Sequence, residues 1–352
     1  MTPFLWRAAA RALVCVCLLA LLGHLTAAKA WDRGDVDVFA TLPAGATGPE
    51  GLTVGPDGKV YVTTFGFNAQ GAQAGPGKLY VFNDDGTLLR QLNVAGSTSH
   101  LLGLAFHPNT HVLLVIDFGA SQVLNVDPHT GSASVFMTIP SPSGAGLNAL
   151  AFDSSGNVYV SDSFQGVIWK TGASGGLATA WVADPLLLPN GIPPFGANGL
   201  AFNRAGNALF VANTANDSIV TIPVTGGTPG TPKALVYSIN GADGIVLDRS
   251  DNIWVAANQS DEIVVIDPTG KVIAKLGDFD GIKNDGTPRG LFFPASPDFS
   301  KDGKSLFVTN LALDLRLAGG PQTLQSQWAD QVKRYTVSRI KARIPNFKGN
   351  DN

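Results

Sequence analysis

Four oxygen-bearing side chains stand at the same place in a repeated sequence pattern. Glu50, Asn148, Asn198 and Asp243 each come directly before a small residue that opens a short apolar run. Hard cations prefer several carboxylate and amide oxygens, with enough negative charge to offset desolvation, whereas zinc favours His or Cys. The four residues therefore predict a metal site for Ca2+ or another divalent cation. Glu50 is conspicuous because the only other Glu of the chain is Glu262.

A structural explanation competes with the metal site. Asn-Gly and Asp-Gly are turn dipeptides, and Asn or Asp before a strand commonly caps a bend. That explanation accounts for any one of the four residues taken alone. The four together, with the rare Glu among them, favour the metal site.

Arg289 and His100 are two further candidates for binding a substrate. Leu102 and Arg289 stand at the equivalent place in the two remaining copies of the pattern. Arg289 would pair with a carboxylate or bind an anionic part of the substrate. His100, two residues before Leu102, is a candidate proton shuttle, with an exposed loop histidine as the alternative. The chain has no phosphate loop or dinucleotide fingerprint.

The pattern itself is a variable residue, a Gly or Ala, an apolar strand, a turn and a second apolar strand. It recurs six times at intervals of 45 to 52 residues, without helical periodicity. Such a period, with short β-branched and aromatic runs, is typical of a β-propeller, in which neighbouring blades share their core. The sequence therefore predicts an all-β fold, a six-bladed β-propeller with the four oxygen ligands at one end of its central channel. The anchors of the repeat are Gly51, Gly103, Ala149, Gly199, Gly244 and Gly290.

A second ring of residues follows the second strand of each copy. We expect these side chains either to orient the metal ligands by hydrogen bonds or to cap the strand ends, and the sequence leaves both open. They are Thr64, Asp117, Asp162, Asn213, Ala257 with Asn258 beside it, and Asn310.

Several segments lie outside the repeats. Residues 31–42 are expected to complete the last blade, with a loose arm as the alternative. Residues 66–78, rich in Gly, Ala and Gln, predict a mobile loop. The apolar, proline-stiffened residues 183–197 predict a wall or lid over the pocket, or else a packed connection. Residues 278–286 resemble a calcium loop only superficially, because Arg289 replaces the acidic twelfth ligand. Residues 332–337 alternate like an outer strand of the sixth blade.

The composition points to one exported globular domain. Apolar residues make up 45% of the 352 residues and charged residues 14%, which supports a large core. Residues 1–30 have the features of a cleaved Sec-type signal peptide, with an uncleaved anchor as the alternative, and predict a secreted or periplasmic protein that leaves the membrane. The propeller would occupy residues 31–346 and a tail residues 347–352. Cleavage removes both cysteines and leaves a net charge of −6, which gives no basis for binding nucleic acid.

The chain resembles the SMP-30/gluconolactonase/luciferin-regenerating family in the order and spacing of Glu50-Gly51, Asn148, Asn198-Gly199 and Asp243-Gly244. The resemblance implies a six-bladed propeller with one divalent ion, usually calcium, in its channel. It makes Glu50, Asn198 and Asp243 direct ligands, lets Asn148 bind the ion or the substrate, and assigns Asp243 as general base or nucleophile. The family's sugar lactonases tend to carry Arg where this chain has Gly146, so the resemblance does not extend to sugar-lactone specificity.

We therefore expect an exported, calcium-dependent hydrolase of lactones or related esters, a monomer whose partner is a small-molecule substrate. The apolar segment 183–197 favours a substrate less polar than a sugar acid. The alternative is a non-catalytic propeller, resembling NHL-repeat modules, that binds a ligand or a protein and uses calcium structurally. A strictosidine-synthase-like condensing enzyme is a third, weaker hypothesis.

Overall fold

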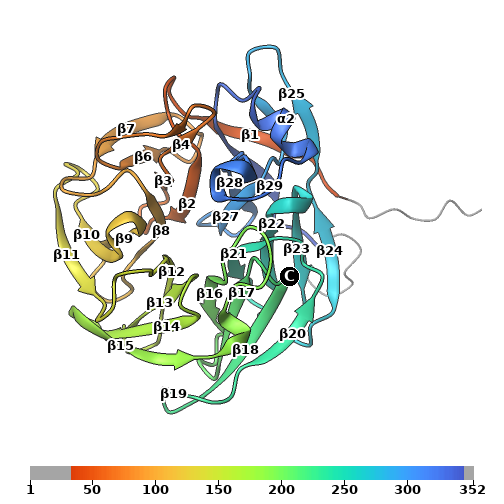
Figure 1. The fold of residues 1–352 in the computed structure, drawn as a ribbon. Helices are drawn as coiled ribbons and strands as arrows, with labels where there is room; N and C mark the ends of the chain where they lie inside the picture. The colour runs from red at the N-terminus through yellow and green to blue at the C-terminus, as the bar shows by residue number, and fades with distance from the viewer. Residues whose placement is uncertain (1–32, 345–352) are drawn as a thin grey trace, which may run out of the picture. The chain divides into compact units, whose positions relative to one another are not determined.

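The computed structural model describes residues 33–344, which belong to one compact unit beginning at Arg33. The predicted signal peptide (1–30) and C-terminal tail (347–352) lie outside the described residues. Between residues 33 and 344, no helix is long and apolar enough to cross a membrane. The fold is all-β and of the propeller type (Figure 1).

Most strands belong to four-stranded antiparallel units in which strands that follow one another along the chain pair side by side. One unit consists of β2 (Pro49–Val54), β3 (Val60–Thr64), β6 (Lys78–Phe82) and β7 (Leu88–Asn93). Another consists of β21 (Ala242–Leu247), β22 (Ile253–Ala257), β23 (Glu262–Ile266) and β24 (Val272–Leu276). A third consists of β16 (Ala197–Phe202), β17 (Ala208–Asn213), β18 (Ser218–Thr225) and β20 (Lys233–Tyr237), with the short β19 (Thr228–Pro229) also paired to β18.

Two further units share a single eight-stranded sheet. The first consists of β8 (Leu101–Phe106), β9 (Leu113–Asp117), β10 (Gln122–Val126) and β11 (Ala133–Thr138). The second consists of β12 (Leu147–Phe152), β13 (Val158–Asp162), β14 (Val167–Gly172) and β15 (Gly175–Ala183). Their outer strands β11 and β15 join them by a short parallel pairing, in which Met137 lies opposite Gly176 and Thr138 opposite Leu177.

The two ends of the described chain meet in one sheet. It has the order β1 (Val36–Thr41), β29 (Thr336–Lys341), β28 (Ser305–Asn310) and β27 (Pro294–Phe299). The N-terminal strand β1 pairs antiparallel with β29, which confirms that this segment completes the last sheet. The strand predicted at residues 332–337 begins later, as β29 at Thr336. It is the third strand of the sheet, because β1 takes the outermost place.

The inner strands of these units contact one another in a closed cycle. The contacts run from β2 to β8, β12, β16, β21 and β27, and from β27 back to β2. Figure 1 shows the same strands around a common centre. The apolar core lies between neighbouring units: Tyr159 and Ile168 of one unit pack with Leu200, Val211 and Val220 of the next. The cycle therefore brings the beginnings of the inner strands close together.

Every inner strand carries a β-bulge close to its beginning. In β2, Pro49 pairs with Thr64 and Leu52 with Val62, so the two residues Glu50 and Gly51 face only one residue of β3. The same one-residue register shift occurs in β8, β12, β16, β21 and β27. A bulge bends the strand and re-aims a side chain. The ligand position of each repeat is thus the first residue of a bulge.

The small residue after the ligand position lets adjacent inner strands approach each other closely. A Cβ on Gly199 would lie 2.5 Å from the carbonyl oxygen of Asp243, and one on Gly51 would lie 2.2 Å from that of Leu102. Because these neighbours are backbone atoms, only a movement of the whole strand could make room.

We expect Gly199→Ala to lower the free energy of unfolding by about 1–3 kcal/mol, the usual cost of overpacking. Urea unfolding will measure the loss. Gly172→Ala is the control, because a Cβ at Gly172 meets no atom within 4 Å. Equal midpoints for the two variants would contradict this account of the repeat.

The prediction that Gly290 begins the inner strand of the sixth copy was wrong. Gly290 lies in β26 (Pro288–Gly290), which pairs with β25 (Phe279–Ile282) in a separate two-stranded sheet. The inner strand of that unit is β27, whose bulge begins at Ala295. Because Pro294 and Pro297 cannot donate backbone hydrogen bonds, β27 does not have the sequence of a typical strand, and the apolar run after Arg289 resembled one instead.

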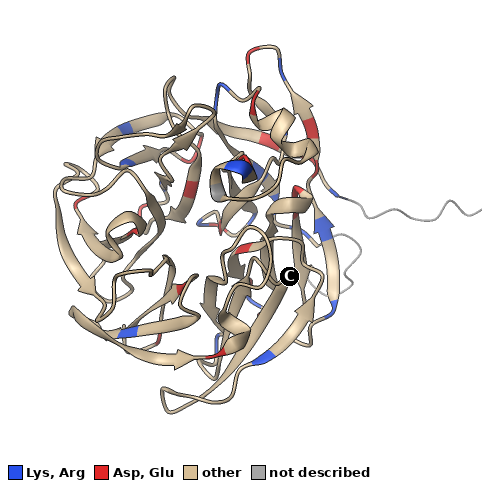
Figure 2. Ribbon diagram, in the orientation of Figure 1, with Lys and Arg blue, Asp and Glu red and all other residues tan. Residues whose placement is uncertain are grey.

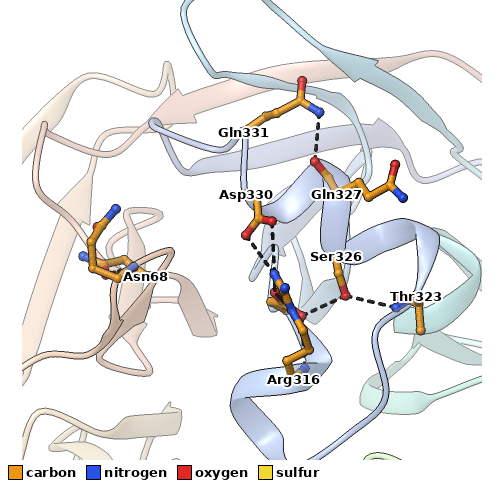
Figure 3. Close-up of polar contacts among 9 residues, drawn as sticks. Asn68, Arg316, Thr323, Ser326, Gln327, Asp330 and Gln331 are labelled. Atoms are coloured by element: carbon orange, nitrogen blue, oxygen red, sulfur yellow. Dashed lines mark hydrogen bonds and ion pairs between the residues drawn. The ribbon is translucent and has the colours of Figure 1, made fainter.

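Two segments gained structure that the sequence did not predict. Residues 66–78 contain a short hairpin of β4 (Phe67–Asn68) and β5 (Gly71–Ala72) rather than a structureless loop. After β28, the chain forms the 3-10 helix η4 (Leu315–Ala318) and the short helix α2 (Leu324–Ala329). Arg316 pairs with Asp314 and Asp330, and Ser326 donates to Asp314 at 2.9 Å, which ties the two helices together (Figure 3).

Candidate metal centre

The four predicted ligands line one cavity at the centre of the ring of inner strands. Glu50 comes from β2, Asn148 from β12, Asn198 from β16 and Asp243 from β21, and all four are buried. Figure 2 shows acidic residues on the inner strands β2 and β21. The cavity measures about 30 Å³, which is room for an ion or a water molecule beside the four side chains.

The remaining wall of the cavity is mostly apolar. The segment that follows β15 contributes Pro193 and Phe195, which confirms that residues 183–197 form a wall of the site. The other lining residues are Phe65, Leu102, Thr214, Asn258, Phe293, Leu311 and Leu313.

Neighbouring hydroxyl groups fix the orientation of both ligand amides. The Asn148 Nδ2 donates to Ser163 Oγ at 3.1 Å, and the Asn198 Nδ2 donates to Thr214 Oγ1 at 3.0 Å. Each hydroxyl gives its own proton to a carbonyl oxygen of the next unit, Ser163 to Ala197 and Thr214 to Ala242, both at 2.7 Å. A hydroxyl has one proton, so it can only accept from the amide. The amide oxygens of Asn148 and Asn198 are thereby left for a cation.

Asp243 is held in a comparable way by one of its two oxygens. Its Oδ2 accepts a hydrogen bond of 3.0 Å from Asn258 Nδ2, and Asn258 lies directly after β22. Its Oδ1 has no hydrogen-bond partner among the described residues, and the same holds for Glu50 Oε2 and Asn258 Oδ1. Unpartnered buried carboxylate oxygens are costly unless a cation or a proton compensates them.

The protonation equilibria of the two acids reflect this shortage of partners. Burial raises the pKa of Glu50 well above its usual value, and the neighbouring charge of Asp243 raises it further. Burial also raises the pKa of Asp243 to about 7, against the opposing hydrogen bond from Asn258. A divalent cation would satisfy both acids at once. The donor set therefore fits a hard cation.

These pKa values predict a pH-dependent calcium affinity. A proton must leave Asp243, with its pKa of about 7, before the ion can bind. Affinity will therefore rise as the pH increases from 5.5 to 8, and binding at pH 6 will release protons. Calorimetry in buffers of different ionisation enthalpy measures both effects. An affinity that is flat across this range would show that these acids do not bind the ion.

The ligand set suits calcium chemistry better than zinc chemistry. Within residues 33–344 there is no group of three or more His, Cys, Asp or Glu placed to hold a metal ion. The candidate centre instead combines two carboxylates with two amides, and calcium accepts such mixed oxygen shells.

Asn258 of the second ring orients Asp243, whereas Asp162 and Asn213 of that ring cap strand ends. Asp162 accepts from the Gly146 N–H at 2.9 Å and from Trp169 Nε1 at 3.0 Å, and Asn213 Nδ2 donates to the Leu186 carbonyl at 2.9 Å. The orienting groups stand one residue later, at Ser163, Thr214 and Asn258. Of these, only Asn258 was noticed in the sequence, although the shared spacing could have identified all three.

Of the three side chains predicted to bind substrate, Asn148 lines the cavity, and Arg289 and His100 do not. Arg289 is exposed in β26 and donates to the carbonyl of Asp280, and Ala295 occupies the sixth ligand position in its place. His100 bonds through Nδ1 to the Phe65 carbonyl at 2.6 Å and stacks on Phe67, with 5.0 Å between the ring centroids. His100 thus lies behind Phe65, which forms the cavity wall.

Comparison with known proteins identifies related folds. Residues 120–277 match the family model described as the SMP-30/gluconolactonase/LRE-like region, and residues 38–65 match the strictosidine synthase-like N-terminal model. No curated protein matches the chain.

Three solved structures share the fold at low sequence identity. A luciferin-regenerating enzyme is 14% identical, with 88% of this chain and 95% of that one covered and a TM-score of 0.63. A gluconolactonase from Xanthomonas campestris is 14% identical, with 90% and 93% covered and a TM-score of 0.62. Regucalcin, a calcium-binding protein from Agrobacterium tumefaciens, is 18% identical, with 88% and 95% covered and a TM-score of 0.61. The resemblance to the SMP-30/gluconolactonase/luciferin-regenerating family is thus confirmed, with the family model matching residues 120–277.

Proposed function

We propose that this protein is a divalent-metal-dependent hydrolase of lactones or related esters, with calcium as the ion. The observation that carries the proposal is the cavity in which two unpartnered carboxylate oxygens, Glu50 Oε2 and Asp243 Oδ1, lie with the oriented amides of Asn148 and Asn198. The match to the SMP-30/gluconolactonase/LRE-like model over residues 120–277 supports the lactonase class. Two of the similar solved structures, one of a gluconolactonase and one of a calcium-binding protein, support it further.

The finer architecture is part of the same proposal. We interpret the units around β2, β8, β12, β16, β21 and β27 as the six blades of a β-propeller, with the cavity in its central channel. The closed cycle of inner-strand contacts and the six equivalent bulges support that count.

Glu50, Asn148, Asn198 and Asp243 would hold the ion. When bound, a divalent cation polarises a carbonyl group and stabilises the negative charge that develops on its oxygen. Ser163 and Thr214 keep the two amide oxygens available, and Asn258 fixes one oxygen of Asp243 while leaving Oδ1 free.

Asp243 is the residue placed to act on the reacting atoms. Its carboxylate would attack the carbonyl carbon or take the proton of an attacking water. In the overall reaction, water adds to the carbonyl carbon, the ring C–O bond breaks, and the leaving oxygen gains a proton. The acid product ionises at neutral pH, so each turnover releases one proton.

The export of the protein remains a proposal that rests on the sequence of residues 1–30. The small-molecule partner and the monomeric state are likewise proposals.

A binding role is the second candidate, because the buried set of two carboxylates and two amides could hold an ion whether or not the site turns over a substrate. In a non-catalytic scaffold the ion would be structural.

Proton release from a panel of lactones and esters tests the proposal. The protein is stripped of metal, assayed, and assayed again after calcium is added to the same sample. Hydrolysis that depends on calcium supports the enzyme. Calcium binding without turnover of any member of the panel would overturn it in favour of the scaffold.

A further inference from the structure

The positions around the cavity divide into a polar half and an apolar half. The residue directly after the second strand is polar in three units, namely Ser163, Thr214 and Asn258. The equivalent residues of the other three units are apolar: Phe65 after β3, Phe118 after β9 and Leu311 after β28. Because the six positions are equivalent in the repeat, this division reflects the side chains and not the fold.

The ligand positions follow the same division. Leu102 and Ala295 replace an oxygen ligand in two of the three apolar units, and both are buried. Phe293, Leu311 and Leu313 extend this surface along the cavity wall. Glu50 is the single polar ligand from the apolar half. A molecule bound beside the ion would therefore meet hydrocarbon on that side.

The hydroxyl groups of the polar half are already engaged. Ser163 and Thr214 each donate to a carbonyl and accept from an amide, so neither has a proton left for a substrate. Among the described residues, the fully buried oxygens of the lining without a partner are Glu50 Oε2, Asp243 Oδ1 and Asn258 Oδ1, which are all acceptors. A polyhydroxylated ring would therefore find few hydrogen-bond partners here, and buried hydroxyls without partners are costly.

An aromatic track joins the cavity to the surface. Phe195 lines the cavity, and its ring centroid lies 5.3 Å from that of Phe164, whose side chain is 36% exposed. Phe118 continues the track, 5.7 Å from Phe164 and 5.6 Å from the cavity residue Phe65.

A second cavity extends the apolar wall. It measures about 100 Å³ and shares Leu311 and Leu313 with the metal centre. The charges at its edge compensate one another, because Arg316 pairs with both Asp314 and Asp330 (Figure 3). The space beyond the shared wall is thus suited to an uncharged group.

We propose that the substrate is a lactone or ester that carries an alkyl or aromatic substituent, and that the apolar half of the site selects it over hydroxylated lactones. This inference rests on the proposed hydrolase function. The ester group would lie beside Asp243, and the substituent against Leu102, Phe195 and the wall of Leu311 and Leu313.

Three lactones with the same six-membered ring test the selection. δ-Valerolactone is the bare ring, δ-decalactone adds a pentyl group, and glucono-1,5-lactone adds hydroxyl groups. Each kcat/KM in calcium is divided by the rate constant of the same lactone with hydroxide. We expect δ-decalactone to exceed δ-valerolactone by about tenfold or more, as burial of added apolar groups gives, and glucono-1,5-lactone to fall below the bare ring.

A matched pair of variants locates the selective surface. Phe195→Ala removes a partly buried ring that lines the cavity, and Phe152→Ala removes a partly buried ring that instead contacts His107, at 5.2 Å between centroids. We expect Phe195→Ala to lower the δ-decalactone preference about tenfold, mainly through KM, while calcium affinity stays unchanged. Phe152→Ala will keep the preference.

Binding of the unreactive lactam 6-pentylpiperidin-2-one, measured by calorimetry, supplies a readout that needs no turnover. It should weaken in Phe195→Ala and not in Phe152→Ala. Preference for glucono-1,5-lactone, or equal effects of the two variants, would overturn this inference and leave the hydrolase intact. Failure of all three lactones together with esters would instead overturn the proposed function.

Discussion

Asp243→Asn will reduce calcium-dependent turnover by roughly 10²–10⁴-fold, the range that loss of a general base or nucleophile commonly costs. The substitution keeps the size of the side chain and the chance to bond with Asn258, so the cavity should retain its shape. What it removes is the negative charge and the nucleophilic oxygen Oδ1. Steady-state kinetics on the best lactone, at saturating calcium, will measure the loss.

The same substitution should not harm the stability of the metal-free protein. The folded-state pKa of Asp243, about 7, exceeds the usual value of 3.8. An acid with a raised pKa destabilises the fold above that pKa, because the folded state prefers the protonated form. At pH 8, metal-free Asp243→Asn should therefore melt at or above the wild-type temperature. Loss of turnover together with a lower melting temperature would instead indicate general damage.

Asp298→Asn is the matched control for Asp243→Asn. Asp298 is a partly buried acid whose pKa is raised by desolvation to about 6, but it accepts hydrogen bonds from the backbone N–H groups of Val54 and Phe299, both at 2.8 Å. Its replacement can change stability, yet turnover per folded molecule should stay within about twofold of wild type. An equal loss in both variants would remove the special role of Asp243.

Glu50→Gln will weaken calcium binding by more than roughly 10–100-fold. That range is typical for loss of a residue that hydrogen-bonds to a metal ligand, and Glu50 would itself be a ligand. Glu50 supplies one of only two negative charges in the cavity, and charge count is a main determinant of calcium affinity. Calorimetric titration at pH 8, above the pKa of about 7 of Asp243, will measure the change.

The other glutamate of the chain is the control for Glu50→Gln. Glu262 is buried but pairs with Arg33 at 2.7 Å and with Lys275 at 2.6 Å. Glu262→Gln will cost stability and leave calcium affinity unchanged. Unchanged affinity in Glu50→Gln would show that the ion binds elsewhere.

The repeat could be recognised in the sequence because close packing of the inner strands demands glycine in four of the six copies. Gly51, Gly103, Gly199 and Gly244 lie where a Cβ would collide with the neighbouring inner strand. That steric demand marks the start of each inner strand, and so it also marks the ligand position just before it. Glu50, Asn148, Asn198 and Asp243 therefore meet in the structure as predicted.

The errors arose where local sequence and tertiary structure disagree. Pro294 and Pro297 make the inner strand β27 difficult to recognise in the sequence. The apolar run after Arg289 has the composition expected of that strand. The apolar half of the site was not foreseen, because Phe65, Phe118 and Leu311 look like ordinary core residues until the repeat equates them with Ser163, Thr214 and Asn258. Helix α2 is only six residues long, too short for a clear periodic signal.

A crystal structure of the protein grown with calcium tests the central claim most directly. The account predicts one ion in the central cavity, at about 2.3–2.6 Å from oxygens of Glu50, Asn148, Asn198 and Asp243. It also predicts that Ser163, Thr214 and Asn258 keep their present hydrogen bonds to the ligands. An empty cavity at saturating calcium, or an ion bound without these four side chains, would contradict the account.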